Sequence, residues 1–104
     1  MIVFIHGGYW QELSKRESFS PAASFVSRGI AYAAVDYTLA PTATIDEIVA
    51  ECRAASAALH AAASDLDVDP ERIVLAGSSA GAHLAAMVCL DPRATWRPAG
   101  LVLI

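Results

Sequence analysis

The chain has 104 residues, which allows one domain at most, and 56 % of them are apolar while only 17 % are charged. This composition excludes a disordered segment, a coiled coil and a nucleic-acid-binding tail. The net charge of −4 also argues against nucleic acids and anionic membranes as partners. No apolar run approaches the roughly 18–20 residues of a membrane span, and the first residues lack the basic start of a signal peptide.

The two cysteines, Cys52 and Cys89, form no C-x-x-C pair. We expect both to be reduced thiols on helices, as is typical of a cytoplasmic protein. We expect no metal site and no cofactor.

The N-terminal third predicts a strand, a short helix and a second strand. Residues 2–5 are an apolar run ended by glycines, as expected of a buried parallel strand. Phe19-Ser20-Pro21 supplies a hydrophobic staple, an N-cap and a first-turn proline for the helix, and Gly29 supplies its left-handed stop. The residues of this helix expected to face inward are Ala22, Phe25 and Val26. Residues 30–35 predict the second strand.

The longest helix is predicted to begin at Thr44. Thr44 and Glu47 have the spacing of a capping box. Residues at intervals of three and four then form one buried stripe, made of Ile45, Ile48, Val49, Cys52, Ala55, Ser56, Leu59 and Ala63. Arg53 and His60 lie off this stripe, and His60 is expected at the surface.

The C-terminal part predicts two more strands with a helix between them. The alternating carboxylates of residues 65–71 resemble part of a calcium loop, but its glycine and distal glutamate are missing, so we expect a solvated connection. Residues 73–76 predict the third strand and 77–81 a turn into a helix that runs to Leu90. Residues 100–104 begin a fourth strand.

The first functional motif is Gly77-Ser78-Ser79-Ala80-Gly81, a G-x-S-x-G between a predicted strand and a predicted helix. A nucleophilic Ser79 must project from a tight, strained turn, and side chains at Gly77 and Gly81 would collide there. The helix that follows directs its N-terminal amides at the site, so the Ala80 amide is a candidate oxyanion donor. The alternative is a plain strand–helix turn whose serine only caps the helix.

The second motif is His6-Gly7-Gly8-Tyr9-Trp10, which follows the first strand. Glycine backbone there can turn N–H groups toward an oxyanion. The alternatives are a phosphate-binding turn and simple turn punctuation, but neither phosphate-binding glycine motif is present. Right-handed crossovers would make the first and third strands neighbours, so both motifs would leave adjacent strand ends. This pairing predicts an acyl-transfer site.

Three motifs in this order, HGGYW, DYTLAP (36–41) and GSSAGAHLA (77–85), resemble those of α/β-hydrolase-fold serine hydrolases. Within them the chain is most similar to the kynurenine formamidase (arylformamidase) group, whereas hormone-sensitive-lipase-like esterases carry a third glycine in place of Tyr9. The resemblance implies an α/β fold: the central portion of an α/β-hydrolase, with about four parallel strands and helices on both faces. Residues 1–104 would then be a partial domain.

The resemblance also implies roles for individual residues. Ser79 would be the nucleophile, and the amides of Gly8, Tyr9 and Ala80 would form the oxyanion hole, with Gly7 shaping the turn. His6 would be a structural brace rather than the base. Tyr37 and Pro41 are expected to support the same loop.

Four other side chains are ambiguous from sequence. His83 lies one turn after Ser79 and is expected to pack beneath the elbow as a buried structural residue. Tyr9 and Trp10 either line an aromatic-substrate pocket or simply pack the loop. Asp36 is not expected to be the triad acid, because that acid follows the serine in this family.

The triad base and acid are missing from the expected places. After Ser79 the sequence offers only His83 and Asp91, on or just past the same helix. We therefore expect the middle portion of a serine hydrolase. Its substrates would be small acyl or formyl esters and amides, with aromatic ones as one option. The 104 residues alone are expected to be close to inactive. The alternatives are a non-catalytic α/β-hydrolase piece, half of a split protein, and a nucleotide-binding doubly wound domain. An uncovered sheet face would favour marginal stability or a homo-oligomer.

Overall fold

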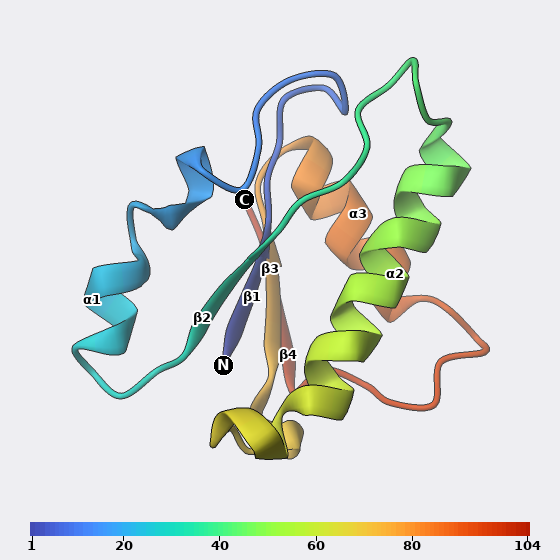
Figure 1. The fold of residues 1–104 in the computed structure, drawn as a ribbon. Helices are drawn as coiled ribbons and strands as arrows, with labels where there is room; N and C mark the ends of the chain where they lie inside the picture. Colours follow the sequence, from blue (N-terminus) through green and yellow to red (C-terminus); the bar gives the residue numbers. More distant parts are fainter.

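The computed structural model describes residues 1–104 and contains one sheet of four parallel strands in the order β2-β1-β3-β4 (Figure 1). The strands are β1 (Ile2–Ile5), β2 (Tyr32–Val35), β3 (Val74–Gly77) and β4 (Gly100–Leu103). Ile5 is in register with Val35 on one side and with Gly77 on the other. The carboxyl ends of β1 and β3 therefore lie side by side, as the crossover rule predicted.

Helices cover both faces of the sheet, so the predicted fold class is confirmed. The long α2 (Ile45–Ala62) and α3 (Ala80–Cys89) pack on one face and against each other, and the short α1 (Ala22–Val26) lies against β2 on the other (Figure 1). Three single 3₁₀ turns complete the chain: Glu17–Phe19, Ser64–Leu66 and Pro70–Arg72.

The core fills the space between the sheet and the α2–α3 layer. Alternate strand residues, among them Val3, Ile5 and Leu75, are fully buried against Ile48 and Leu84 of the helices. The predicted stripe of α2 is confirmed at its centre, while its first member, Ile45, is 38 % exposed. Both cysteines are free, and burial raises the pKa of Cys52 to about 12. This thiol is therefore a packing group.

The start of α2 is the predicted capping box. The Thr44 hydroxyl accepts a hydrogen bond from the Glu47 amide at 3.2 Å, and the Glu47 carboxylate accepts from the Thr44 amide at 2.7 Å. Two helix-end amides are thereby satisfied by local sequence alone.

The prediction for α1 was wrong in its details. Ser20 does not cap the helix: it already has helical backbone angles (φ −54°, ψ −37°) because a 3₁₀ turn precedes it, whereas an N-cap needs extended backbone. Val26 is 60 % exposed and does not pack inward, while Phe19 is half-exposed and meets the Tyr32 ring edge-on at 6.3 Å. A helix of five residues can bury few side chains. In α1 the main inward contact is made by Phe25, which stacks on Tyr32. The stop at Gly29 (φ +73°) is as predicted.

The two edges of the sheet are less covered than its centre. Every residue of β2 except Val35 is only half-buried. On β4, Leu101, Val102 and Leu103 are 40–53 % exposed, which agrees with the expected uncovered apolar surface.

The acidic connection between α2 and β3 is built from two 3₁₀ turns, with Asp67 in the left-handed region. No cluster of three or more potential metal-ligating side chains occurs in the structure. Nor does it contain a helix with the length and hydropathy needed to cross a bilayer.

The contribution of the capping box to stability can be tested by substituting Thr44. Thr44→Ala removes the acceptor for the Glu47 amide and should lower the free energy of unfolding by about 1 kcal/mol, measured by urea denaturation. Thr44→Ser keeps the acceptor and should retain most of that stability. An equal loss in both variants would contradict the role given to the hydroxyl.

Candidate active site

The turn between β3 and α3 holds Ser79 in a strained conformation. Its backbone angles are φ +53° and ψ −117°, a region that costs a non-glycine residue about 1–3 kcal/mol. Backbone hydrogen bonds hold the turn: the Ser79 amide donates to the carbonyl of Ile104 at 2.7 Å, and the Ser79 carbonyl accepts from Ala82 at 2.9 Å. The turn is thus fixed from the sheet and from the helix at once.

Glycines surround Ser79 because the backbone segments there approach without room for side chains. A Cβ at Gly77 would collide with the carbonyl of Gly81, and a Cβ at Gly81 would collide with the carbonyl of Ile5 at the end of β1. A Cβ at Gly7 would lie 2.7 Å from the Ser78 carbonyl oxygen and 3.3 Å from the Ser79 Cβ. The two glycine motifs therefore form one structural unit.

The loop after β1 is itself strained. Gly8, Tyr9 and Trp10 follow one another in the left-handed region, with φ of +97°, +52° and +61°. Only the first of them is a glycine, and a Cβ there would collide with the carbonyl of Glu12. Such conformations persist only where the surroundings enforce them, and they concentrate at functional sites.

Several backbone amides of these two loops donate no hydrogen bond within the protein: those of Gly7, Gly8, Tyr9 and Trp10 in the glycine loop, and that of Ala80 in the elbow. The next amides of the turn are used, since Gly81 donates to Ser78 and Ala82 to Ser79. Unpaired amides beside a projecting hydroxyl are the donors that a tetrahedral oxyanion requires.

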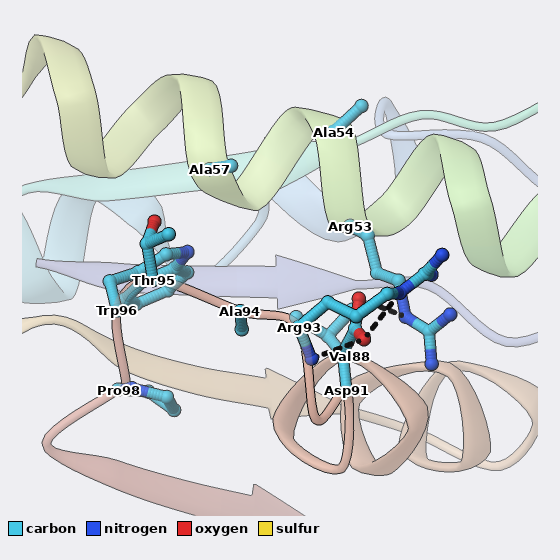
Figure 2. Close-up of a pocket in the computed structure, with 10 residues that line it drawn as sticks. All are labelled: Arg53, Ala54, Ala57, Val88, Asp91, Arg93, Ala94, Thr95, Trp96 and Pro98. Carbon is cyan, nitrogen blue, oxygen red and sulfur yellow. Dashed lines mark hydrogen bonds and ion pairs between the residues drawn. The ribbon is translucent and has the colours of Figure 1, made fainter.

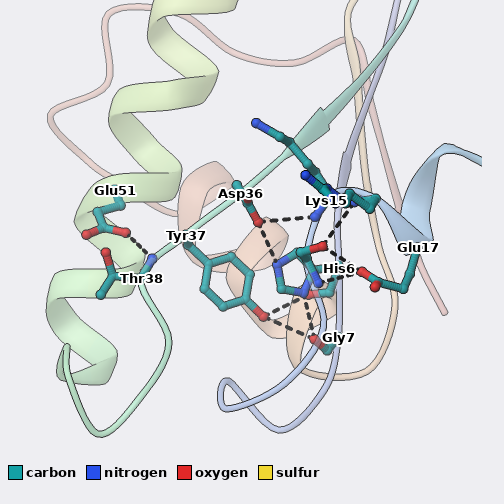
Figure 3. A network of polar contacts seen from close by, with 10 residues as sticks. His6, Gly7, Lys15, Glu17, Asp36, Tyr37, Thr38 and Glu51 are labelled. Carbon is teal, nitrogen blue, oxygen red and sulfur yellow. Dashed lines mark hydrogen bonds and ion pairs between the residues drawn. The ribbon is translucent and has the colours of Figure 1, made fainter.

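His6 and Tyr37 both hydrogen bond to the start of the glycine loop (Figure 3). His6 is 2 % exposed, its Nδ1–H donates to the Gly7 carbonyl at 2.8 Å, and its ring stacks on Tyr37 at 4.2 Å. The Tyr37 hydroxyl donates to the carbonyls of His6 and Gly7 at 3.0 and 3.2 Å. Burial raises the pKa of Tyr37 to about 12, so the phenol keeps the proton that it donates.

The segment 36–41 also makes hydrogen bonds to the glycine loop and to the residues that follow it. The Asp36 carboxylate accepts from the Lys15 amide at 3.1 Å and lies 3.5 Å from His6 Nε2 (Figure 3). The Ala40 amide donates to the Trp10 carbonyl at 2.7 Å. Tyr9, by contrast, projects outward and is 77 % exposed.

The structure corrects the placement of His83. It is exposed and meets the edge of the Trp10 ring at 5.5 Å, instead of lying buried beneath the elbow. The buried side of α3 consists of Gly81, Leu84, Ala85 and Val88. The helical period places His83 on the opposite side, where the Trp10 loop passes.

No hydrogen bond joins Ser79 Oγ to any of the three histidines. His6 donates to the Gly7 carbonyl and His83 faces Trp10. His60 is half-buried and stacked on Trp96 at 4.8 Å, so the expectation of a simple surface residue was wrong. No sequence periodicity marks Trp96, because it lies in an irregular connection.

A cavity of about 430 Å³ opens beside Ser79. The glycine loop and the elbow form one wall, and the other is formed by Phe4, Tyr32, Glu17, Ser18, Ser20 and Pro21. Its one carboxylate belongs to Glu17, which accepts from the Ser14 amide and hydroxyl at 2.8 and 2.7 Å. These hydrogen bonds lower the pKa of Glu17. Sequence reasoning missed this wall, because an irregular segment carries no periodic signal.

A strained serine between a strand and a helix, with a glycine loop at the adjacent strand end, defines this chain as an α/β-hydrolase-fold protein. Residues 1–95 match the model of the BD-FAE family, and the chain belongs to that family.

Similar proteins include a kynurenine formamidase of Salmo salar, 39 % identical over 88 residues, which are 85 % of this chain and 29 % of that protein. A kynurenine formamidase of Danio rerio is 40 % identical over the same shares. A solved bacterial heroin esterase matches with a TM-score of 0.89 and 37 % identity, over 98 % of this chain and 33 % of its own. The chain thus spans about a third or less of the length of these proteins.

The close approach at Gly81 can be tested by adding one methyl group. Gly81→Ala should lower the free energy of unfolding by about 3 kcal/mol, because the new Cβ meets backbone that has no room to shift. Gly100→Ala is the matched control: its Cβ would find only ordinary contacts, 3.6 Å from the Val74 side chain. Chemical denaturation of both variants measures the difference, and equal stability would contradict the close approach.

Proposed function

We propose that Ser79 is the nucleophile of a serine hydrolase that acts on small acyl or formyl esters and amides. Its oxygen attacks the carbonyl carbon while its proton passes to a base and on to the leaving group. Water then releases the acyl group from Ser79 as an acid. The observation that carries this proposal is the strained Ser79 turn in direct contact with the glycine loop at Gly7.

The same proposal assigns the oxyanion of the tetrahedral intermediate to the amides of Gly8, Tyr9 and Ala80. Their lack of an acceptor within the protein supports this assignment. The amino-terminal end of α3 adds a positive field on the side where the negative charge develops. Gly7, Gly77 and Gly81 would act indirectly, by letting the backbone segments approach.

We propose that the base and its orienting acid come from outside these 104 residues, because no histidine of the chain is hydrogen bonded to Ser79. The residues would then form a partial α/β-hydrolase domain, completed by further polypeptide. Loss of a triad base costs on the order of 10⁶ in turnover. The chain by itself should therefore turn over esters only slowly.

The substrate class is proposed from the loop and the relatives together. Tyr9 is exposed on the loop that carries the unpaired amides, and Trp10 of the same loop packs against His83. Aromatic side chains placed in this way suit an aromatic formamide or ester. The names of the relatives, kynurenine formamidase and heroin esterase, agree with this class.

Two further proposals concern the cellular compartment of the protein and its association with other polypeptide. The free cysteines suit a reducing, cytoplasmic compartment. The exposed apolar side chains of β4 favour burial against the further polypeptide proposed above or against a second copy of the chain.

Covalent labelling tests the nucleophile without requiring turnover. A fluorophosphonate probe should modify Ser79 in preference to other serines, as located by peptide mass spectrometry. Free imidazole, acting as the missing base, should raise the rate of labelling by about tenfold or more. Ser78→Ala is the matched control, since it removes a neighbouring hydroxyl and leaves the nucleophile in place.

The result predicted is labelling that disappears in Ser79→Ala and persists in Ser78→Ala. Labelling spread evenly over the serines, or unaffected by imidazole, would instead support a non-catalytic member of the fold.

A further inference from the structure

Two arginines, Arg53 and Arg93, lie beside the buried carboxylate of Asp91 at the carboxyl end of α3 (Figure 2). Asp91 is 8 % exposed, and its side-chain oxygens lie 3.4 Å from Arg53 Nε and 3.2 Å from Arg93 Nε. Arg97 Nη1 donates to the Asp91 carbonyl at 2.9 Å. Three of the chain's seven basic residues thus surround a single acid, which leaves a local excess of positive charge in a chain of net charge −4.

The guanidinium groups are only partly used. Each has five N–H donors. Arg53 directs Nε and Nη2 to the Met87 carbonyl, at 3.3 and 3.0 Å, and Arg93 uses Nε alone. The remaining donors of Arg93 make no hydrogen bond within the protein, and its side chain is 80 % exposed.

Arg53, Arg93 and Asp91 line a cavity of about 290 Å³ between α2 and residues 91–98. Arg53 and Arg93 lie at one end, and Thr95, Trp96 and Pro98 lie at the other (Figure 2). The walls between the two ends are apolar and made of small side chains: Ala54, Ala57, Val88 and Ala94. An apolar cleft with a few convergent polar groups is the usual form of a small-molecule site.

The Trp96 ring is already held in place at the apolar end. His60 of α2 stacks on it at 4.8 Å, with an angle of 16° between the ring planes. An ordered aromatic ring costs little additional entropy when a flat ligand packs beside it.

The cavity is separate from the candidate active site. It shares no lining residue with the cavity beside Ser79, and it lies at the carboxyl end of α3, whereas Ser79 precedes the amino end.

We propose that this cavity is a second binding site, for a small aromatic carboxylate. The carboxylate would take the unused N–H donors of Arg93 and Arg53, where the charge of Asp91 leaves a positive excess. The aromatic ring would lie along the alanine walls toward Trp96. Arginine suits this role because its planar donors match the two oxygens of a carboxylate.

Titration with three simple probes tests the proposal on the folded chain. Benzoate carries both features, benzamide keeps the ring without the charge, and acetate keeps the charge without the ring. Binding is followed by the amide NMR shifts of residues 91–98. Benzoate should bind at least about tenfold more tightly than either of the other two probes.

Arg93→Gln should weaken benzoate binding by about tenfold or more, since it removes the free donors. The variant should fold, because the Arg93 side chain is 80 % exposed and Arg53 still pairs with Asp91. Arg16→Gln makes the same charge change at a distant exposed arginine whose side chain has no hydrogen bond, and it should leave benzoate affinity unchanged. The proposal is overturned if benzoate binds no more tightly than benzamide or acetate, or if the two variants behave alike.

Discussion

The candidate site depends on one steric constraint: three stretches of backbone meet at the carboxyl end of the sheet with no side chain between them. The first turn of α3 touches the end of β1 at Gly81, and the glycine loop touches the elbow at Gly7. Because these contacts are between backbone atoms, they fix the loop and the elbow relative to each other more tightly than side-chain packing would. A methyl group at Gly81 would force β1 and α3 apart, and one at Gly7 would push the glycine loop away from the elbow.

This close approach is maintained by structure on both sides of the sheet end. On the glycine loop, the protonated Tyr37 hydroxyl and the buried His6 ring donate hydrogen bonds to the carbonyls of His6 and Gly7. On the elbow, the Ser79 amide donates to the carbonyl of Ile104, the residue that follows β4. The hydrogen bonds and the packed core around Ser79 and Tyr9 therefore hold their backbone in its strained conformation. A rigid scaffold that presents a strained serine is also what acyl transfer demands, because the donors must already be in place when charge develops.

Much of this arrangement could be predicted from the sequence where the determinants are local. The capping box of Thr44 and Glu47, the stop at Gly29 and the strand order depend on short-range chemistry and on crossover handedness. The predictions for Ser20 and His83 were wrong because each residue's surroundings come from distant or irregular segments. The arginine cluster at Asp91 was invisible for the same reason, since its members lie on α2 and on the irregular connection before β4.

The central claim is that the glycine loop and the elbow together bind an oxyanion formed at Ser79. A crystal structure of the chain phosphonylated at Ser79 tests it most directly, because the phosphoryl oxygen occupies the place of that oxyanion. The account predicts a phosphoryl oxygen within about 2.7–3.1 Å of at least two of the amide nitrogens of Gly8, Tyr9 and Ala80. A phosphoryl oxygen directed into solvent, with those three amides still unpaired, would contradict it.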